Sequence, residues 1–321
     1  DTNFAAQSFW KDVRIRFFRK KSAVLGLVMI MIILLLAVFG PGMNAYTYSG
    51  QDLSQKNFAP RVPGIEQFGI LDGSEKMSTT TGTKIVNNYV EKGKDDVYYW
   101  FGSDLYGRDI WTRTWEGARV SLIIAVAAAV IDMVIGMSYG LISGYFGGRV
   151  DMVMQRFLEV ANGIPRLVIV TLLLLVLQPG MVTIIFALML TEWVGMSRIA
   201  RAEMLKLKDQ EFVLASRTLG AGSFFIIFKE VLPNIIGPII TQVMFSIPTA
   251  IFTEAFLSFV GLGIPVPQCS LGSLISELYN SFTTHPYQII PPIVVMSLLM
   301  LSFNLLADGL REALDPKMKS M

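Results

Sequence analysis

Three carboxylic acids lie inside long apolar stretches, where an acidic side chain is costly. Asp132 is the only carboxylate between Arg119 and Arg149, and Glu192 and Glu254 fall late in two later stretches. If these stretches cross a membrane, each ionised carboxylate costs roughly 2.5–3.5 kcal/mol on insertion scales, so each must face protein or water. We expect Asp132 near mid-membrane, and the two glutamates close enough to the ends of their stretches to be interfacial.

The other reactive side chains exclude most metal and thiol chemistry. The chain has one cysteine and one histidine. The single cysteine, Cys269, excludes an intrachain disulfide and a cysteine-based zinc site. The single histidine, His285, excludes an HExxH motif and any paired-histidine metal centre. We expect both residues to be incidental and solvent-exposed in a loop.

Of the enzyme classes, an intramembrane protease comes closest to what these residues allow, but the sequence does not meet its requirements. An aspartyl type needs two facing aspartates, but Asp308 falls at the end of its apolar stretch whereas Asp132 falls near the middle of its own. A serine type needs a Ser–His pair within the membrane, and His285 is in a loop. The sequence also lacks GxxxxGK(S/T), so it cannot hold nucleotide phosphates with a P-loop. We expect no catalytic residue, no metal site and no cofactor on this chain.

The composition indicates the class of protein in which these residues lie. Of the 321 residues, 53% are hydrophobic and 16% are charged, whereas soluble proteins carry about 25% charged residues. The 27 Lys and Arg residues against 25 Asp and Glu residues give a net charge of +2, which is too even for a nucleic-acid binder. The composition therefore indicates an integral membrane protein.

Uncharged apolar runs of about 20 residues predict six membrane-spanning helices and an all-α membrane fold. The runs are Ala23–Gly40, the stretch between Arg119 and Arg149, two stretches between Arg166 and Arg198, the stretch between Glu230 and Glu254, and Pro286–Ala307. Gln178-Pro179-Gly180 divides the third and fourth runs, which predicts a tight helical hairpin. We expect the first helix of that hairpin to start near Ala161, with Pro165 in its first turns.

The distribution of Lys and Arg predicts that both termini are cytoplasmic. Basic residues gather before the first span, between the second and third spans, between the fourth and fifth spans, and after the last span. The loop Gly261–Tyr287 has no Lys or Arg and is expected outside. The loop Pro41–Arg119 has basic residues, but loops longer than about 60 residues cross regardless of their charge.

The two outer loops differ in predicted structure. Residues Asp72–Lys84 are polar and rich in Gly and Thr, so we expect a mobile segment within the first loop. In the second loop, the spacing of apolar residues between Ser270 and Asn280 predicts a short amphipathic helix.

The segment Arg198–Asn234 begins like a helix leaving the membrane and then contains small residues at Ala215, Ser216 and Gly220. Small residues let a short helix seat deep in a groove of another protein. Gly220 suits the left-handed conformation that ends a helix, and Pro233 suits the first turn of the next span. Spacing alone leaves a plain loop between two helices equally open.

This segment resembles the cytoplasmic EAA loop of permeases of binding-protein-dependent ABC transporters, whose pattern is EAA, three residues, Gly, nine residues, Ile-x-Leu-Pro. Five residues match in register: Ala215, Ser216, Gly220, Leu232 and Pro233. Leu214 stands in place of the Glu and Glu230 in place of the Ile, as in the looser loop of the oligopeptide/dipeptide/nickel branch.

Two further segments resemble that branch. Its FG(S/T)DxxGRD segment matches here at Gly102, Asp104, Gly107, Arg108 and Asp109. The GARxSL entry to the second span is matched by the run Gly117–Leu122, and the basic-then-apolar start is similar to the C-type, OppC/DppC-like subunit.

The resemblance implies a type I ABC importer permease fold. Residues 1–40 would form the N-terminal segment and first span, 41–119 an extracytoplasmic loop, 120–310 the five-helix core with a coupling loop at 198–234, and 311–321 a cytoplasmic tail. It implies a prokaryotic cell membrane, a second homologous permease (OppB/DppB-like), two cytoplasmic ATPases (OppD/OppF-like) and an extracytoplasmic binding protein. ATP and magnesium would be bound by the ATPases.

The resemblance gives Asp132 a hypothetical role, in which it lines the pathway or pairs with the second permease. The alternative is a protonated or helix-bonded Asp that only packs. Peptides are the commonest cargo of the branch, and nickel, glutathione and some sugars are alternatives. A secondary transporter is a further alternative, although it leaves the segment Arg198–Asn234 unexplained.

Overall fold

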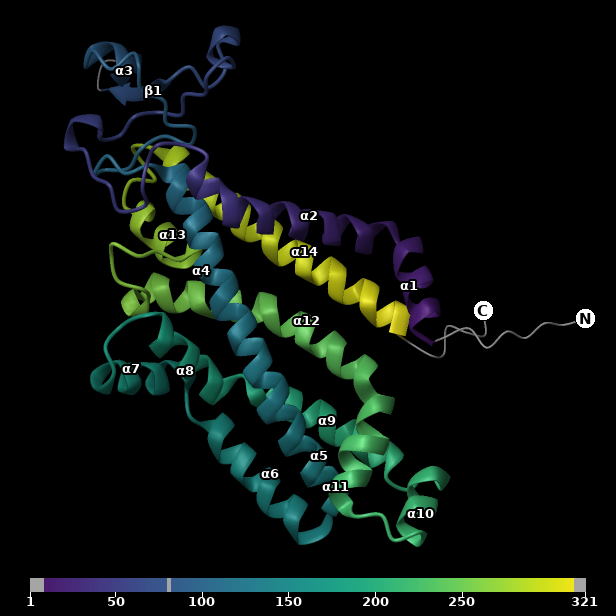
Figure 1. The fold of residues 1–321 in the computed structure, drawn as a ribbon. Helices are drawn as coiled ribbons and strands as arrows, with labels where there is room; N and C mark the ends of the chain where they lie inside the picture. Colours follow the sequence, from purple (N-terminus) through teal and green to yellow (C-terminus); the bar gives the residue numbers. More distant parts are fainter. Residues whose placement is uncertain (1–8, 80–81, 315–321) are drawn as a thin grey trace, which may run out of the picture.

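The computed structural model describes residues 9–79 and 82–314, most of which are helical. Figure 1 shows a long bundle of helices with the first outer loop gathered at one end. Five helical runs are long and apolar enough to cross a membrane, and a bent helix pair makes a sixth if it is counted as one span. Within the described residues, this agrees with the predicted number of spans.

The helical runs contain the following elements. The first run holds α2 (Lys21–Phe39) and η1 (Gly40–Gly42), and the second holds α4 (Ile110–Ile131), the π-helical η4 (Asp132–Gly136) and α5 (Met137–Phe146). The bent pair is α6 (Gly148–Gly163) and α7 (Arg166–Val176), and the next run is α8 (Met181–Thr191) with α9 (Trp193–Leu207). The fifth run joins α11 (Ser223–Phe225), the π-helical η5 (Ile226–Val231), α12 (Leu232–Leu257) and η6 (Ser258–Leu262), and the last is η7 (Pro286–Gln288) with α14 (Ile290–Leu314).

The remaining elements lie outside these runs. They are α1 (Phe9–Arg19), η2 (Leu53–Gln55), η3 (Glu66–Phe68), β1 (Ser74–Thr79), β2 (Gly82–Asn87), α3 (Asn88–Glu91), α10 (Glu211–Thr218) and α13 (Leu271–Tyr279). Helix α13 confirms the short amphipathic helix expected in the second outer loop.

Helix α4 lies at the centre of the bundle. It packs against α2, α8, α12, α13 and α14, and α2 runs alongside α14 (Figure 1). The main core forms around it and includes Ile124, Ala125, Ile251 and Leu299. Because lipid tails are as apolar as the helices, membrane helices associate through close packing, which the alanines of α4 favour.

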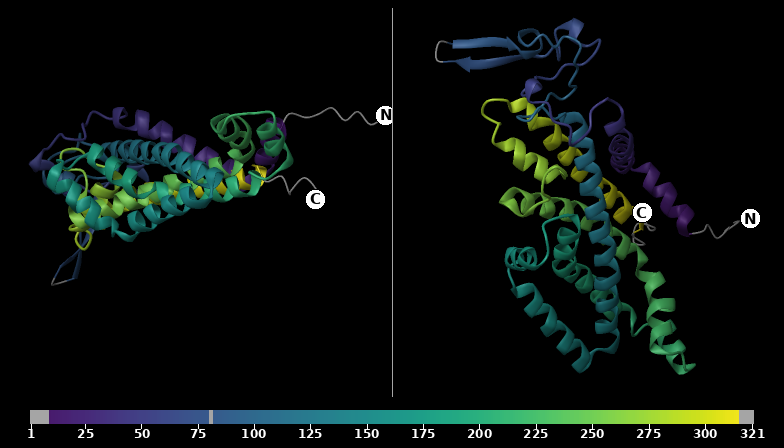
Figure 2. Two further views of the ribbon diagram at one scale, coloured as in Figure 1. Left: turned by 90° about the horizontal axis from the view of Figure 1, so that it is seen from below. Right: turned by 60° about the vertical axis from the view of Figure 1, so that its left-hand side comes forward.

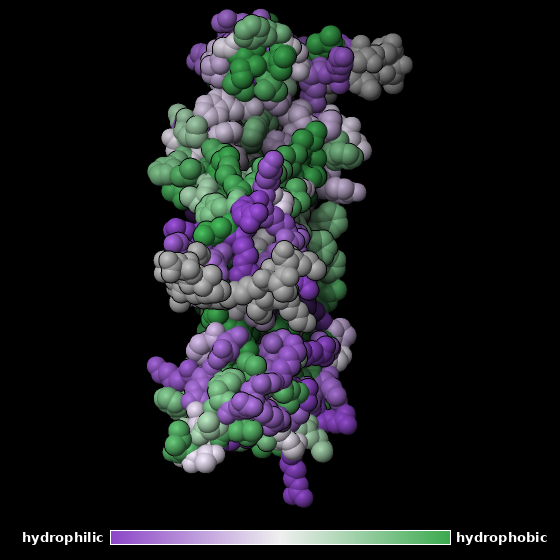
Figure 3. Space-filling view, turned by 90° about the vertical axis from the view of Figure 1, so that its right-hand side faces the viewer, coloured by the Kyte–Doolittle hydropathy of each residue, from purple (hydrophilic) through white to green (hydrophobic). Residues whose placement is uncertain are grey.

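The surface separates by polarity along the molecule. In the view of Figure 3, hydrophobic side chains cover much of the region next to the outer loop, whereas hydrophilic side chains gather across the middle and at the lower end. Large apolar side chains such as Leu35, Val130 and Leu175 are exposed. In a membrane protein these side chains meet lipid or neighbouring subunits rather than water.

Several predicted boundaries are wrong. The helix expected to start near Ala161 is two helices, because α6 continues to Gly163 and α7 starts at Arg166 after a bend of 78°. Pro165 lies at that break, since proline disfavours helical conformation in the residue before it. The hairpin of α7 and α8 across Gln178-Pro179-Gly180 is present.

The boundaries of the outer loop and the tail also move. Residues 110–119 belong to α4 rather than to the loop, and Arg311 belongs to α14 rather than to a tail. Residues 315–321 of the expected tail lie outside the described part of the chain.

The segment expected to be mobile forms an antiparallel β-hairpin with Ser74 paired to Asn87, although residues 80–81 lie outside the description. Figure 2 shows the hairpin projecting from the outer end of the molecule. Below it, Phe58, Tyr89 and Tyr99 form a small buried aromatic core. The sequence missed the hairpin because its polar strands do not alternate in hydropathy.

Three glycines allow α5 and α9 to pack backbone against backbone. Gly136, Gly140 and Gly144 recur every four residues and face α9 along one line. A Cβ atom on Gly140 would lie 2.1 Å from the carbonyl oxygen of Ser197. The small-xxx-small pattern brings membrane helices together in this way.

We expect Gly140→Ala to lower the stability of the protein by about 1–3 kcal/mol, because overpacking forces the two backbones apart. Gly195→Ala is the matched helical control, since a Cβ atom there meets nothing within 4 Å. Thermal unfolding in detergent measures both variants. Equal shifts in Tm would contradict the packing argument.

Candidate functional site

The segment between α9 and α11 is a short helix with a glycine stop. Helix α10 ends at Thr218, and Gly220 has φ of +83°. The N–H of Ala221 donates to the carbonyl of Ser216 and the N–H of Gly220 donates to that of Arg217, both at 3.0 Å. This is a Schellman motif, so the predicted left-handed Gly220 is present for the expected reason.

One side of α10 is anchored to the transmembrane body. Val213 is buried in a cluster with Met204, Ile226 and Val231. The hydroxyl of Ser216 donates to the carboxylate of Glu230. The guanidinium of Arg217 lies 4.9 Å from the centre of the Tyr145 ring. These contacts hold α10 against the end of α5 and against η5.

The other side of α10 is exposed and carries apolar residues beside Glu211 and Thr218. Ala215 and Gly220 are exposed, and Leu219 is 87% exposed. Phe212, Leu214 and, in α11, Phe224 and Phe225 are also exposed. A group of exposed apolar side chains on a polar end of a protein marks an interaction site. We name these seven small and apolar residues the α10 platform.

Two matched positions lie apart from the platform. Leu232 and Pro233 begin α12, with Pro233 in its first turn as predicted. The helical run itself begins earlier, at Ser223, through the π-helical η5. Leu232 and Pro233 therefore lie where the α10 segment joins α12.

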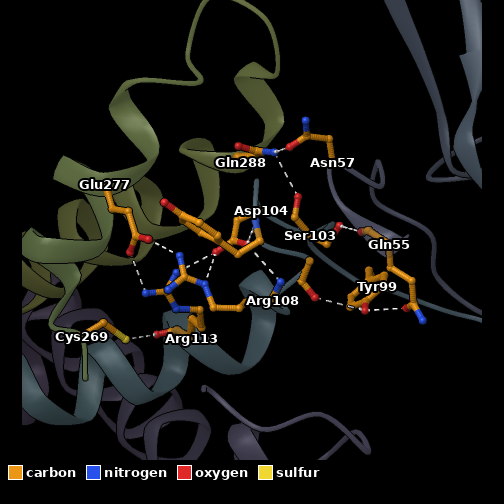
Figure 4. A network of polar contacts seen from close by, with 12 residues as sticks. Gln55, Asn57, Tyr99, Ser103, Asp104, Arg108, Arg113, Cys269, Glu277 and Gln288 are labelled. Atoms are coloured by element: carbon orange, nitrogen blue, oxygen red, sulfur yellow. Dashed lines mark hydrogen bonds and ion pairs between the residues drawn. The ribbon is translucent and has the colours of Figure 1, made fainter. Parts of the chain in front are cut away.

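The outer motif forms a buried ion network between the two outer loops (Figure 4). Asp104 accepts from Arg108 Nε at 2.7 Å and from Arg113 Nη1 at 2.8 Å. Both arginines also pair with Glu277 of α13, Arg113 at 2.7 Å. We name these four residues the outer clamp.

Other motif residues shape the turn before α4. Gly102 and Gly107 have φ of +84° and +71°. Asp109 caps α4, since its carboxylate accepts from the N–H of Thr112 at 2.8 Å and from Asn44 Nδ2 at 2.8 Å. A side-chain acceptor at the N-cap satisfies a backbone N–H that would otherwise have no partner.

Sequence reasoning missed Arg113 and Glu277 of the outer clamp. Glu277 is the only Asp or Glu between Gly261 and Tyr287, and a lone carboxylate on an amphipathic helix was the available signal. Its partners are 164 and 169 residues away, so no local spacing reveals them.

The outer clamp changes the titration of Glu277. Burial raises the pKa of Glu277, but the charges and hydrogen bonds of Arg113 and Arg108 outweigh burial and hold that pKa below its usual range. The carboxylate is therefore ionised at neutral pH and, together with Asp104, balances the charges of two arginines that have almost no contact with water.

Glu277→Gln is expected to lower the free energy of unfolding by about 1–3 kcal/mol, because it leaves buried arginine donors with poorer acceptors. Glu159→Gln is the control, since its pair with Arg156 is exposed and such pairs contribute about 0–1 kcal/mol. Thermal unfolding of both variants measures the two losses of stability. A larger loss for Glu159→Gln would contradict the stabilising role given to the outer clamp.

The lowered pKa predicts a pH dependence with a definite sign. The stabilisation is fully present above the pKa of about 4.3 that Glu has in unfolded chains, and it is lost as pH falls through the lower folded pKa. The difference in Tm between wild type and Glu277→Gln should therefore shrink from pH 6 to pH 3. A difference that grows on acidification would reverse the sign and refute the assignment.

The three carboxylates within the spans are satisfied in different ways. Asp132 begins η4, is 3% exposed, and accepts from Ser246 Oγ at 2.6 Å. Glu192 lies at the junction of α8 and α9 and pairs with Arg166 Nη1 at 2.7 Å. It lies in the middle of the run Met181–Leu207, and the interfacial position expected for it stays a prediction.

Glu254 is fully buried, and its interfacial depth stays a prediction. Its carboxylate accepts from Ser258 Oγ at 2.7 Å, Ser270 Oγ at 2.5 Å and Ser121 Oγ at 3.2 Å. These hydroxyls come from η6, from the N-cap of α13 and from α4. Glu254 thus joins three elements at the outer end of the bundle.

The cysteine and histidine are buried, which corrects the expectation of solvent exposure. Cys269 lies against α4, with Sγ 3.5 Å from the carbonyl oxygen of Arg113, and burial raises the pKa of its thiol. His285 Nδ1 lies 2.9 Å from Glu75 Oε2 and so joins the hairpin to the second outer loop. Asp308 is exposed on α14. Within the described residues, no cluster of His, Cys, Asp and Glu is suited to a metal ion.

Comparison with known proteins identifies the family. Residues 136–320 match the family described as the binding-protein-dependent transport system inner membrane component, and residues 8–60 match the N-terminal transmembrane domain of oligopeptide transport permease C. The chain belongs to this permease family. The motifs that suggested it, in the α10 segment and the outer clamp, lie in ordered and distinct parts of the fold.

Curated relatives cover almost the whole permease. The chain is 41% identical over 312 residues to the oligopeptide transport system permease protein OppC of Bacillus subtilis, across 97% of this chain and 91% of that protein. It is 42% identical over 318 residues to the dipeptide transport system permease protein DppC of Lactococcus lactis subsp. cremoris, across 97% and 92%.

A solved structure supports the fold. The chain is similar to a chain of the MetNI methionine ABC transporter in an inward-facing conformation, with a TM-score of 0.53 and 16% sequence identity over 62% of this chain and 94% of that chain. The predicted type I ABC importer permease fold is thus confirmed, and the permease is a subunit that acts in transport across a membrane.

Proposed function

We propose that the chain imports peptides as one of two permease subunits of an ATP-driven, binding-protein-dependent transporter. The observation that carries this is the α10 platform, an exposed apolar surface held rigidly at the end of the helices that cross the membrane. The relatives named for oligopeptide and dipeptide transport supply the cargo class.

In this proposal the permease catalyses no reaction itself. The α10 platform seats in a cleft on a cytoplasmic ATPase, and ATP with magnesium binds to that partner. The second permease completes the pathway, and each permease contacts one of two ATPases. An extracytoplasmic binding protein delivers the peptide to the outer loops, where the β1–β2 hairpin projects (Figure 2).

The proposed orientation puts α10 and both chain ends on the cytoplasmic side of a prokaryotic cell membrane. Basic residues are dense in α1, around α9 and α10, and near the end of α14, as the positive-inside rule requires. The outer clamp and the hairpin then face the binding protein.

Ala215→Asp tests the platform. Ala215 is exposed, so the fold should persist, whereas a carboxylate without a partner in a protein interface is strongly unfavourable. We expect recovery of the ATPases with the tagged permease to fall at least about tenfold, which corresponds to about 1.4 kcal/mol. Peptide uptake by proteoliposomes should fall with it.

Thr283→Asp is the matched control, because Thr283 is exposed on the opposite, outer side. This substitution should leave ATPase recovery unchanged. Mild detergent extraction followed by mass spectrometry gives the readout. Wild-type permease that purifies without a second permease and ATPases, in several mild detergents, would refute the proposed assembly.

A further inference from the structure

A polar cavity of about 270 Å³ lies within the transmembrane part of the permease. Its polar lining includes Asn162, Arg166, Glu192, Arg198, Gln242 and Ser246. These residues come from the break between α6 and α7, from the junction of α8 and α9, and from the middle of α12. The cavity therefore forms where three apolar runs meet.

The cavity lies between runs that are candidate membrane spans. Glu192 is near the centre of the run Met181–Leu207, and Gln242 and Ser246 are near the centre of the run Ser223–Leu262. Within a membrane span, non-helical backbone and charged side chains are tolerated only where they are buried in protein or line a water-filled space. The broken helices and charges around this cavity meet that condition.

The charges of the lining favour an anion. Arg166 is paired with Glu192 and also donates to Thr253 Oγ1 at 3.2 Å. Arg198 is exposed to the cavity and has no ion-pair partner among the described residues. One positive charge is therefore left without a partner.

Two neighbouring features bear on that charge. Arg166 is the first residue of α7, an 11-residue helix, and the first turn of a helix carries free N–H groups and a partial positive charge. Asp132 is the other carboxylate nearby, but it is buried and reaches the lining only through Ser246. Arg166 is exposed as well, but it is paired with Glu192, so the unpaired charge of the cavity is that of Arg198.

We propose that the cavity is a transit site that holds the terminal carboxylate of the peptide, with Arg198 as its charge partner and Asn162 and Gln242 as hydrogen-bond donors. The site rests on the proposed peptide cargo. Its volume is below the roughly 300–1,000 Å³ of pockets that enclose drug-sized ligands, so it takes one end of a peptide.

The arrangement also suits release. A transported solute must bind well enough to enter a site and weakly enough to leave it. Glu192 neutralises Arg166, so the peptide carboxylate meets one uncompensated guanidinium rather than two. A site with both arginines free would hold the carboxylate more tightly.

The test compares two cargoes in the complete transporter reconstituted in proteoliposomes with its binding protein. One cargo is a peptide with a free terminal carboxylate and the other is the same peptide as its amide. Because every permease variant receives cargo from the same binding protein, a change in the ratio of acid to amide uptake between variants comes from the permease.

Arg198→Gln should lower uptake of the acid about tenfold, since hydrogen bonds to a charged partner are the strong ones, and should change uptake of the amide less than about twofold. Arg198→Lys should keep the preference for the acid. Arg156→Gln is the matched control, because Arg156 is exposed on α6 and paired with Glu159, and it should leave both uptakes unchanged.

Parallel loss of acid and amide uptake in Arg198→Gln, or an unchanged ratio, would overturn the transit site while leaving peptide import intact. Failure of the wild-type transporter to take up either peptide would instead overturn the proposed cargo and the transit site with it. Basal ATPase activity of each complex shows whether the variant is assembled.

Discussion

Arg113 is completely buried at the outer end of α4, and an arginine cannot lose its charge at physiological pH. Its guanidinium must therefore be met by carboxylates, which Asp104 and Glu277 supply from two different loops. Helix α4 is also the helix around which the others pack. The outer loop, α13 and the central helix are consequently held in one arrangement, and removal of any one charge leaves the buried network with one uncompensated charge.

Buried carboxylates elsewhere in the molecule also need partners, and they find them in different ways. Glu254 has three serine hydroxyls, Glu192 has an arginine, and Asp132 has one serine hydroxyl. Because its donors are hydroxyls, Glu254 connects neighbouring elements without a second buried charge. The pair of Glu192 with Arg166 instead lies beside a cavity, where water and a passing solute can reach it.

The features that depend on local chemistry were predictable from the sequence. Apolar runs gave the spans, Pro179-Gly180 gave the α7–α8 hairpin, and Gly220 gave the end of α10. The bend at Pro165 and the β-hairpin have local causes and were missed, whereas the burial of Cys269 and His285 was not predictable, because it depends on contacts between distant residues. Glu277 shows this most clearly, since its arginine partners are more than 160 residues away in the sequence. The exposure of Ala215 beside half-buried Ser216 likewise depends on how α10 meets η5.

Helix α9 starts beside Glu192 and ends next to α10. Its 15 residues rise about 1.5 Å each, so it is a rod of roughly 22 Å. The three glycines of η4 and α5 let their backbone pack directly against that of α9. Few side chains therefore lie between the two helices to absorb a displacement. A displacement of the end next to α10 would therefore be passed along the rod to its other end, beside the Arg166–Glu192 pair. The protein thus has a stiff mechanical connection between the α10 platform and the Arg166–Glu192 pair.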